Sequence, residues 1–282
     1  MATNSLSRRD INVLEKIKDP ESNPLTAVIV DASLPKDPNI TNIKIYDDIS
    51  QKERDVISAM QKFETQLANF QRHDSTAESV NETQDADLER HYSVAGLVKE
   101  YRQCVSRIGD IISEYPDYAS ARNNRAQALR RLHGDTMLFP GGHGPGGLQH
   151  DADAAERRQA AVLALSDLDK AIALLTPKSL FASISPQAGK TLALAHTQRA
   201  AIYYTTSKFF QTSKVADIRE RKEATWTKID FEEAASRDFA LGGRYGNEIA
   251  KGLAVSTNPT AKLCGQMVRE AMKKEYGPAY AT

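Results

Sequence analysis

Apolar residues recur at spacings of three and four along most of this chain, and that spacing predicts amphipathic α-helices. It first appears over residues 50–72, where Val56, Met60, Phe63 and Leu67 would share one helical face. Proline or glycine follows several of these stretches, as expected where a helix ends. The pattern predicts an all-α protein with helices over residues 50–72, 89–114, 119–133, 154–175, 186–204, 231–239, 247–254 and 260–274.

Polar or glycine-rich stretches separate several of these helices. We interpret residues 73–88, 136–153 and 205–230 as loops that are long for connections between neighbouring helices. A glycine pair at positions 242 and 243 predicts the end of the helix before it. The helical pattern is therefore interrupted by insertions, while no run of residues predicts a sheet.

The N-terminal region has a weaker pattern. Ile11, Leu14 and Ile17 would share one face of a short helix over residues 7–18. A run of β-branched residues between prolines predicts an extended segment over residues 23–31. Because no partner strands are evident, we expect this segment to pack along helices.

Two parts of the chain resemble one another as a helix–turn–helix repeat. In the first, Ala126 is the small residue of one helix, and Ala164 and Ala171 flank Leu168 in the next helix. Small residues at such positions let two helices approach closely, as in the tetratricopeptide repeat of about 34 residues. The alternative is an unrelated helical bundle with alanine at its contacts.

The second copy repeats the same residue types after an insertion. Arg199-Ala200 corresponds to Arg125-Ala126, and Phe239 ends the copy. The two arginines stand where such repeats usually carry an apolar residue. We expect them to tie neighbouring helices together, with ligand contact as the alternative. The positions that we assign to the repeat framework are Arg125, Ala126, Ala164, Leu168, Ala171, Arg199, Ala200 and Phe239.

These repeats predict a tetratricopeptide helical-hairpin solenoid of about three repeats, with long loop insertions and a C-terminal capping helix. The expected segments are an N-terminal extension (1–49), a degenerate first helical pair (50–118), a repeat with a Gly-rich insertion (119–178, insertion 136–153), a second repeat (186–243, insertion 205–230) and C-terminal capping helices (244–282).

Composition narrows the classes of function. The chain has 282 residues, with 37 Lys and Arg against 37 Asp and Glu. This balance gives no electrostatic support for binding nucleic acid or an anionic membrane. Two cysteines cannot form a disulfide framework, and no stretch is apolar enough to span a membrane. We expect a cytoplasmic protein, with the nucleus not excluded.

Motifs typical of catalysis lack their structural context. The glycines over residues 141–147 enclose Pro145 and lie between two predicted helices, unlike a dinucleotide-binding turn. Gly189-Lys190-Thr191 lacks the leading glycine of a phosphate-binding loop. The same glycine-rich loop carries possible metal ligands, but its expected mobility argues against a preorganised site. We predict no catalytic residue, metal or cofactor, and therefore no enzyme; the ligand types considered are His143, His150, Asp151 and Asp153.

A protein-binding groove is the expected functional site, because stacked repeats form a concave surface. Two helices would supply its side chains. The residues that we place in the groove are Asn123, Asn124, Gln127, Arg130, Arg131, Thr197 and Gln198. Trp226 lies in the second insertion, where we expect it to anchor that insertion to the core, although an exposed binding anchor is the alternative.

The chain resembles the tetratricopeptide repeat protein 36 family. The resemblance is carried by the segments 118–128, 134–135, 165–172, 198–200, 236–239 and Asn258–Met267. The last of these, Asn258–Met267, lies outside the generic repeat. The resemblance implies a non-enzymatic adaptor that binds Hsp70-type chaperones. It also implies a link to tyrosine catabolism through protection of a metabolic enzyme, and a chaperone-independent module that stabilises such an enzyme is the alternative function.

Chaperone-binding repeats hold a C-terminal carboxylate with asparagine, lysine and arginine side chains. By resemblance, Asn124 occupies the asparagine position of the second repeat. In the third repeat, Gln198 replaces the arginine and Leu194 replaces the lysine. The sequence therefore leaves open whether the groove holds a carboxylate, which partner it binds and in which oligomeric state.

Overall fold

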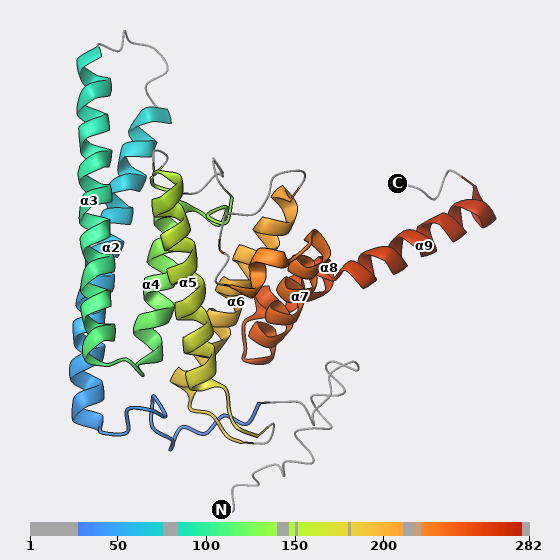
Figure 1. Cartoon of the computed structure of the whole chain (residues 1–282), viewed down its shortest axis with the longest axis horizontal. Coiled ribbons are helices and arrows are strands. Elements are labelled where there is room, and N and C mark those ends of the chain that lie inside the picture. Colours follow the sequence, from blue (N-terminus) through green and yellow to red (C-terminus); the bar gives the residue numbers. More distant parts are fainter. Residues whose placement is uncertain are drawn as a thin grey trace, which may run out of the picture.

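In the part of the chain that the structure describes, helices account for almost all the regular structure (Figure 1). This is a computed structural model that describes residues 28–75, 84–139, 147–149, 152–179, 182–210, 218 and 221–277. The predicted helix over residues 7–18 lies outside these ranges. The helices are α2 (Ile43–Ser75), α3 (Gln84–Glu114), α4 (Ala119–His133), α5 (Ala154–Leu175), α6 (Pro186–Phe209), α7 (Lys228–Arg244), α8 (Glu248–Thr257) and α9 (Pro259–Tyr276), with a 3-10 turn η2 (Lys222–Thr225).

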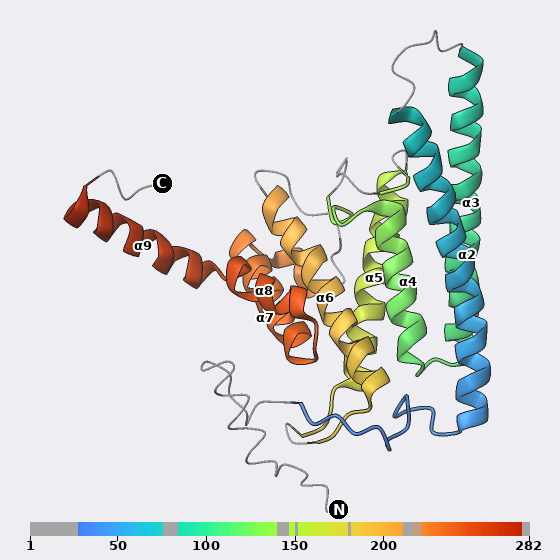
Figure 2. The same ribbon diagram turned by 180° about the vertical axis from the view of Figure 1, so that it is seen from behind.

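Consecutive helices pack as antiparallel hairpins that follow one another in a row (Figures 1 and 2). The hairpins are α2 with α3, α4 with α5, and α6 with α7, and each also contacts the next hairpin. This arrangement confirms the predicted all-α tetratricopeptide solenoid. One cluster of buried apolar residues lies between α4, α5, α6 and α7 and forms the main core. A second cluster joins α2, α3 and α4.

The small repeat positions lie at the contacts between helices. Ala126, Ala164, Ala171 and Ala200 are completely buried, and so is the larger Leu168. Alanine has no side chain beyond Cβ, so the two helices of a hairpin can approach closely at these positions. The α4–α5 hairpin therefore owes its close packing to residue types that are readable in the sequence.

The bounds of α4 and α5 agree with the predicted ranges because local signals set them. Gly134, with φ of 75°, follows α4 in a conformation that favours glycine. The side chain of Asp153 accepts a hydrogen bond from the backbone N–H of Glu156 and caps the start of α5.

The first hairpin is longer than predicted, and the loop over residues 73–88 is shorter. α2 begins at Ile43, because Asn42 accepts hydrogen bonds from the backbone N–H groups of Lys44 and Ile45. At the other end, residues 73–75 belong to α2 and residues 84–88 to α3. Polar composition therefore did not prevent residues 73–75 and 84–88 from continuing the two helices.

The insertion predicted over residues 205–230 is also shorter. α6 continues to Phe209, α7 starts at Lys228, and η2 lies between them. Trp226 packs edge-on against Tyr203 and Phe231, with ring centroids 5.1 Å apart in both pairs. Trp226 therefore lies against the core, as expected from the sequence.

A buried carboxylate holds the same insertion. Glu223 is completely buried and accepts hydrogen bonds from the Tyr203 hydroxyl at 2.6 Å and from Arg221. Arg221 also reaches Asp169 on α5 at 2.6 Å. The connection between α6 and α7 is thus bound to two helices of the core.

The glycine pair at 242 and 243 lies in the last turn of α7, which ends at Arg244, slightly later than predicted. A Cβ on Gly242 would lie 2.6 Å from Oγ1 of Thr197, and a Cβ on Gly243 would lie 2.8 Å from Cα of Lys251. Glycine at these positions lets α6 and α8 approach α7, so the pair serves packing as well as the end of the helix.

The described part of the predicted extended segment, from residue 28, runs beside the α5–α6 connection. The N–H of Ile184 donates to the carbonyl of Ile29, and the N–H of Asp31 donates to the carbonyl of Ile184. Further on, Asn39 donates to the carbonyl of Leu174 at the end of α5. In the described part of the chain, the segment forms no sheet: its pairing with Ile184 is an isolated bridge to the α5–α6 connection, and Val28 packs against the core cluster.

Of the two C-terminal helices, only α8 covers the end of the solenoid. It packs against α7 and buries Ala250 and Thr257. In contrast, α9 extends away from the other helices (Figures 1 and 2) and buries none of its residues. The capping role expected for residues 244–282 is therefore limited to the first helix of that segment.

Candidate functional site

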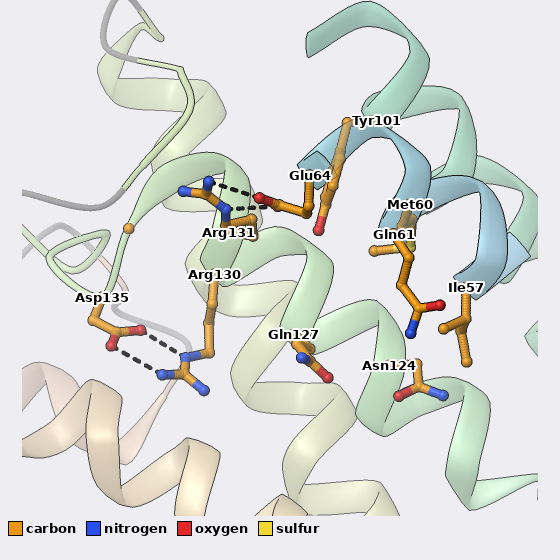
Figure 3. A pocket seen from close by; sticks show the side chains of 11 residues that line it. Ile57, Met60, Gln61, Glu64, Tyr101, Asn124, Gln127, Arg130, Arg131 and Asp135 are labelled. Carbon is orange, nitrogen blue, oxygen red and sulfur yellow. Dashed lines mark hydrogen bonds and ion pairs between the residues drawn. The ribbon is translucent and has the colours of Figure 1, made fainter. Parts of the chain in front are cut away.

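A pocket of about 520 Å³ lies between α2, α3 and α4 (Figure 3). Four of the predicted groove residues line it, namely Asn124, Gln127, Arg130 and Arg131, all from α4. The other lining residues are Ile57, Met60, Gln61 and Glu64 from α2, Tyr101 from α3, and Gly134 and Asp135 after α4. The pocket has an apolar side on α2 and an amide- and arginine-rich side on α4.

Acidic residues of the same chain pair with both arginines of the pocket. Nε of Arg131 lies 2.7 Å from one oxygen of Glu64, and a second nitrogen lies 2.9 Å from the other oxygen. Arg130 makes the same kind of two-point contact with Asp135, at 2.6 and 2.9 Å. Figure 3 shows the two pairs on one side of the pocket. The four charges sum to zero, so the pocket has no excess of positive charge for an incoming carboxylate.

Asn124 is also bound to a carboxylate of this chain. Its amide donates to Glu53 of α2 at 2.7 Å, and the same carboxylate accepts hydrogen bonds from the Tyr118 hydroxyl at 2.6 Å and the Ser120 hydroxyl at 3.0 Å. Burial raises the pKa of Glu53, although these three hydrogen bonds act in the opposite direction. The amide that the clamp resemblance singled out thus already serves as a donor to a buried acid.

Three of the predicted groove residues lie elsewhere. Asn123 and Gln198 are buried, and Nε2 of Gln198 donates to Oδ1 of Asn123 at 2.8 Å between α6 and α4. Gln198 also accepts a hydrogen bond from Arg130 at 3.2 Å. Thr197 receives a hydrogen bond from Asn247 at 3.0 Å, at the contact of α6 with the start of α8. Because the hairpins stack closely, polar side chains at these positions pair with one another instead of lining the pocket.

The two repeated arginines make equivalent contacts inside their hairpins. Arg125 of α4 binds both oxygens of Asp167 on α5, at 2.6 and 2.8 Å. Arg199 of α6 binds both oxygens of Asp238 on α7, at 2.7 Å each. Both aspartates are nearly completely buried, so each arginine joins the two helices of its hairpin. This is the structural arrangement that we expected for them.

Sequence reasoning missed the roles of the acidic partners, although two of them carry a signal. Asp167 and Asp238 each precede the large residue of the second repeat helix, Leu168 and Phe239, so aligning the two copies would have matched them. Glu53 and Glu64 have no such signal, because they lie on the degenerate first helix, far from α4 along the chain.

Comparison with known proteins gives one relative that covers almost the whole chain. The chain is 32% identical to the L-tyrosine degradation gene cluster protein hmgX of Aspergillus fumigatus, over 96% of this chain and 93% of that protein. It is also 29% identical to the tetratricopeptide repeat protein 36 homolog of Drosophila melanogaster and 27% identical to tetratricopeptide repeat protein 36 of Mus musculus, over 54% and 62% of this chain and 51% and 62% of those proteins. The chain belongs to the family of hmgX and tetratricopeptide repeat protein 36. No family model and no solved structure matches it.

Membership of the hmgX and tetratricopeptide repeat protein 36 family agrees with the resemblance drawn from the sequence. The segment Asn258–Met267, which carried the resemblance outside the generic repeat, comprises the cap and first turns of α9. The side chain of Asn258 accepts hydrogen bonds from the N–H groups of Thr260 and Ala261, and Pro259 occupies the first turn. The motif therefore encodes a well-defined helix start in this family member.

The other motifs considered for chemistry have structural places or lie outside the described residues. Gly189, Lys190 and Thr191 are inside α6, where a phosphate-binding loop would need an irregular turn. Asp153 caps α5, while His143, His150 and Asp151 lie outside the described part. In that part, no group of three possible ligands is placed to hold a metal ion, and no helix is long and apolar enough to cross a membrane.

Proposed function

We propose that this chain is a non-enzymatic scaffold that binds and stabilises an enzyme of L-tyrosine degradation, independently of chaperones. The observation that carries the proposal is the similarity to hmgX, a protein named for an L-tyrosine degradation gene cluster, over 96% of this chain. Similarity over the whole solenoid means that the stacked hairpins are shared, and stacked repeats form extended surfaces for protein binding.

The pocket between α2 and α4 is the proposed contact with the partner. It offers the amides of Gln61 and Gln127 beside an apolar wall that includes Ile57 and Met60. Amides both donate and accept hydrogen bonds, so they suit peptide groups and uncharged polar side chains. The balanced charges of the pocket favour an uncharged segment of the partner.

The non-enzymatic part of the proposal rests on the relatives and on the chemistry of this pocket. The relatives that cover about half of the chain are named as tetratricopeptide repeat proteins. The two carboxylates that line it, Glu64 and Asp135, are each paired with an arginine, and burial raises the pKa of the Tyr101 hydroxyl. The side chains of the pocket that could act as nucleophiles are thus either held by a cation or kept protonated.

Binding of an Hsp70-type chaperone is the second candidate. One observation favours it, because Asn124, Arg130 and Arg131 do line one pocket. A terminal carboxylate would have to displace Glu64 or Asp135 from an arginine, and it would compete with Glu53 for the amide of Asn124. These internal contacts place this candidate behind binding of an uncharged segment.

The test uses the purified full chain and the purified enzymes of L-tyrosine degradation from the same organism. Calorimetric titration measures affinity, and the thermal midpoint of each enzyme is measured with and without the chain. We expect one enzyme to bind and to gain stability, since a ligand that binds only the folded state raises the midpoint. Gln127→Glu, which adds a charge to the pocket, is expected to weaken binding by about tenfold or more.

The matched control is Gln187→Glu, the same change at an exposed position of α6. Equal affinity of the two variants would exclude the pocket as the contact, and absence of binding to every enzyme would exclude the proposed partner. A third arm titrates an acidic peptide that ends in a chaperone-type C-terminal carboxylate. Binding of that peptide that is lost in Asn124→Ala would favour the chaperone candidate instead.

A further inference from the structure

Beyond its first turn, α9 is exposed around its whole circumference. Every residue from position 263 to 276 is exposed. Among them, the side chains of Leu263, Met267, Val268 and Met272 are exposed by 56, 62, 58 and 40%. Exposed apolar residues that are scattered singly are ordinary, but these four belong to one short helix and one face of it.

The apolar residues of α9 follow a strict spacing. Leu263, Met267 and Ala271 are four residues apart, and so are Cys264, Val268 and Met272. Residues four apart lie above one another along an α-helix, so the six side chains form two adjacent ridges. The opposite side carries Lys262, Gln266, Arg269, Glu270 and Lys273, and α9 is therefore amphipathic.

Such a helix needs a surface to pack against. A single helix of this length has marginal stability in water, because most helical stability in proteins comes from packing of the apolar face. Gly265 inside α9 lowers its intrinsic helical propensity further, by about 1 kcal/mol relative to alanine. The exposed apolar face therefore lacks the packing partner that a helix of such weak intrinsic stability needs.

We propose that α9 pairs with α9 of a second copy of this chain, antiparallel, to form a symmetric dimer. This goes beyond the proposed function, since it concerns a different surface from the pocket. The reason for choosing a second copy is the symmetry of the apolar pattern about the midpoint between Met267 and Val268. In a two-fold symmetric contact, each residue that touches a partner residue is touched in return by the equivalent pair.

In this register, each of the six ridge residues meets another ridge residue of the second copy. Met267 faces Val268 of the second copy, Cys264 faces Ala271, and Leu263 faces Met272. Ridges formed by residues four apart interdigitate at a crossing angle of about −50°, the commonest angle between helices in globular proteins.

The area available predicts a weak dimer. Burial of one Leu, Met or Val side chain removes on the order of 100 Å² of apolar surface from water. The facing side chains of two copies would thus bury roughly 800–1,000 Å² in total, below the ~1,200–2,000 Å² of stable specific interfaces. The dimer is accordingly expected to form at micromolar concentration and to dissociate on dilution.

Sedimentation equilibrium of the full chain over a range of concentrations tests the proposal. The mass is expected to rise from 31.1 kDa toward twice that value as concentration increases. Met267→Glu and Val268→Glu should remain monomeric, because they bury two like charges at the centre of the contact. The control Gln266→Glu adds the same charge on the polar side and should dimerise like the unmodified chain. All variants should keep the thermal midpoint of the solenoid, since α9 buries no residue.

Cross-linking tests the register. In a chain with Cys264→Ser, Val268→Cys should form an intermolecular disulfide on oxidation, because the two copies of position 268 meet near the symmetry axis. Leu263→Cys should not, because its two copies would be ~13 Å apart along the helices, beyond the reach of a disulfide. A monomer at every concentration, or equal masses for Met267→Glu and Gln266→Glu, would overturn the dimer. Equal cross-linking at positions 263 and 268 would overturn the antiparallel arrangement.

Discussion

Arg199 and Asp238 form a two-point ion pair inside the last hairpin, with Nε and Nη2 of the arginine each 2.7 Å from a carboxylate oxygen. Asp238 is only 3% exposed, and His196 lies 2.9 Å from the same carboxylate. Arg125 and Asp167 repeat this contact one hairpin earlier. The alanine contacts let the two helices of each repeat approach closely, and these two ion pairs set how the helices align.

Breaking the Arg199–Asp238 pair should destabilise the fold strongly. We expect Arg199→Ala to lower the free energy of unfolding by about 3–5 kcal/mol, since it leaves a buried carboxylate without its cation. Urea unfolding measures the loss, and a double-mutant cycle with Asp238→Ala isolates the coupling. The control is the exposed pair of Lys170 and Asp117, 3.5 Å apart, whose coupling should stay below about 1 kcal/mol. Similar couplings in both cycles would refute the structural role of the repeated arginine.

Acid should weaken the fold through Asp238. Burial disfavours its charge, but hydrogen bonds from Arg199 and His196 outweigh burial and hold the pKa of Asp238 below its usual range. A carboxyl whose pKa is lowered in the folded state adds stability above the pKa of the unfolded chain, roughly 4. That stability is lost as the pH falls through the folded-state pKa. The stability difference between the unmodified chain and Asp238→Asn should therefore shrink below about pH 4, as measured by urea unfolding at a series of pH values. A difference that stays constant with pH would contradict this.

The glycine pair inside α7 should be intolerant of a side chain. We expect Gly243→Ala to lower stability by about 1–3 kcal/mol, because its Cβ would lie 2.8 Å from Cα of Lys251. Gly252 in α8 has nothing within 4 Å of the equivalent position. Gly252→Ala should accordingly raise stability, by up to about 1 kcal/mol. Thermal or urea unfolding of the two variants gives the comparison, and the same sign for both would show that close packing is not what glycine serves at position 243.

Removing one acidic residue should change which ligands the pocket accepts. Glu64→Gln leaves the shape nearly unchanged and shifts the charge of the pocket from zero to plus one. We expect an acidic peptide with a free C-terminus to bind this variant about tenfold more tightly than the unmodified chain. Fluorescence anisotropy of a labelled peptide measures the change. Glu114→Gln, at an exposed residue that pairs with Lys52 outside the pocket, is the control. If both variants bind the peptide equally, the charge balance of the pocket does not select its ligand.

The parts of the fold that were predictable are those with local causes. α4 ends at Gly134 and α5 begins at Asp153, where these residues provide cap geometry, and such signals act within a single turn. The repeat framework was readable because small and large residues recur in register. α7 was predicted too short because the meaning of Gly242 and Gly243 depends on Thr197 and Lys251, which approach from other helices.

By itself, the sequence determined an all-α repeat fold, the helices of its central hairpin and the helix that supplies most of the polar wall of the pocket. Only the tertiary structure decided the chemistry of that pocket. In the structure, Arg131 of α4 pairs with Glu64 of α2, and the amide of Asn124 donates to Glu53. Gln198 lies in the contact between hairpins and not in the pocket. The physical reason is distance along the chain. Helical periodicity reports which face of one helix is buried, whereas a charge or an amide is satisfied by whichever residue packing brings near it.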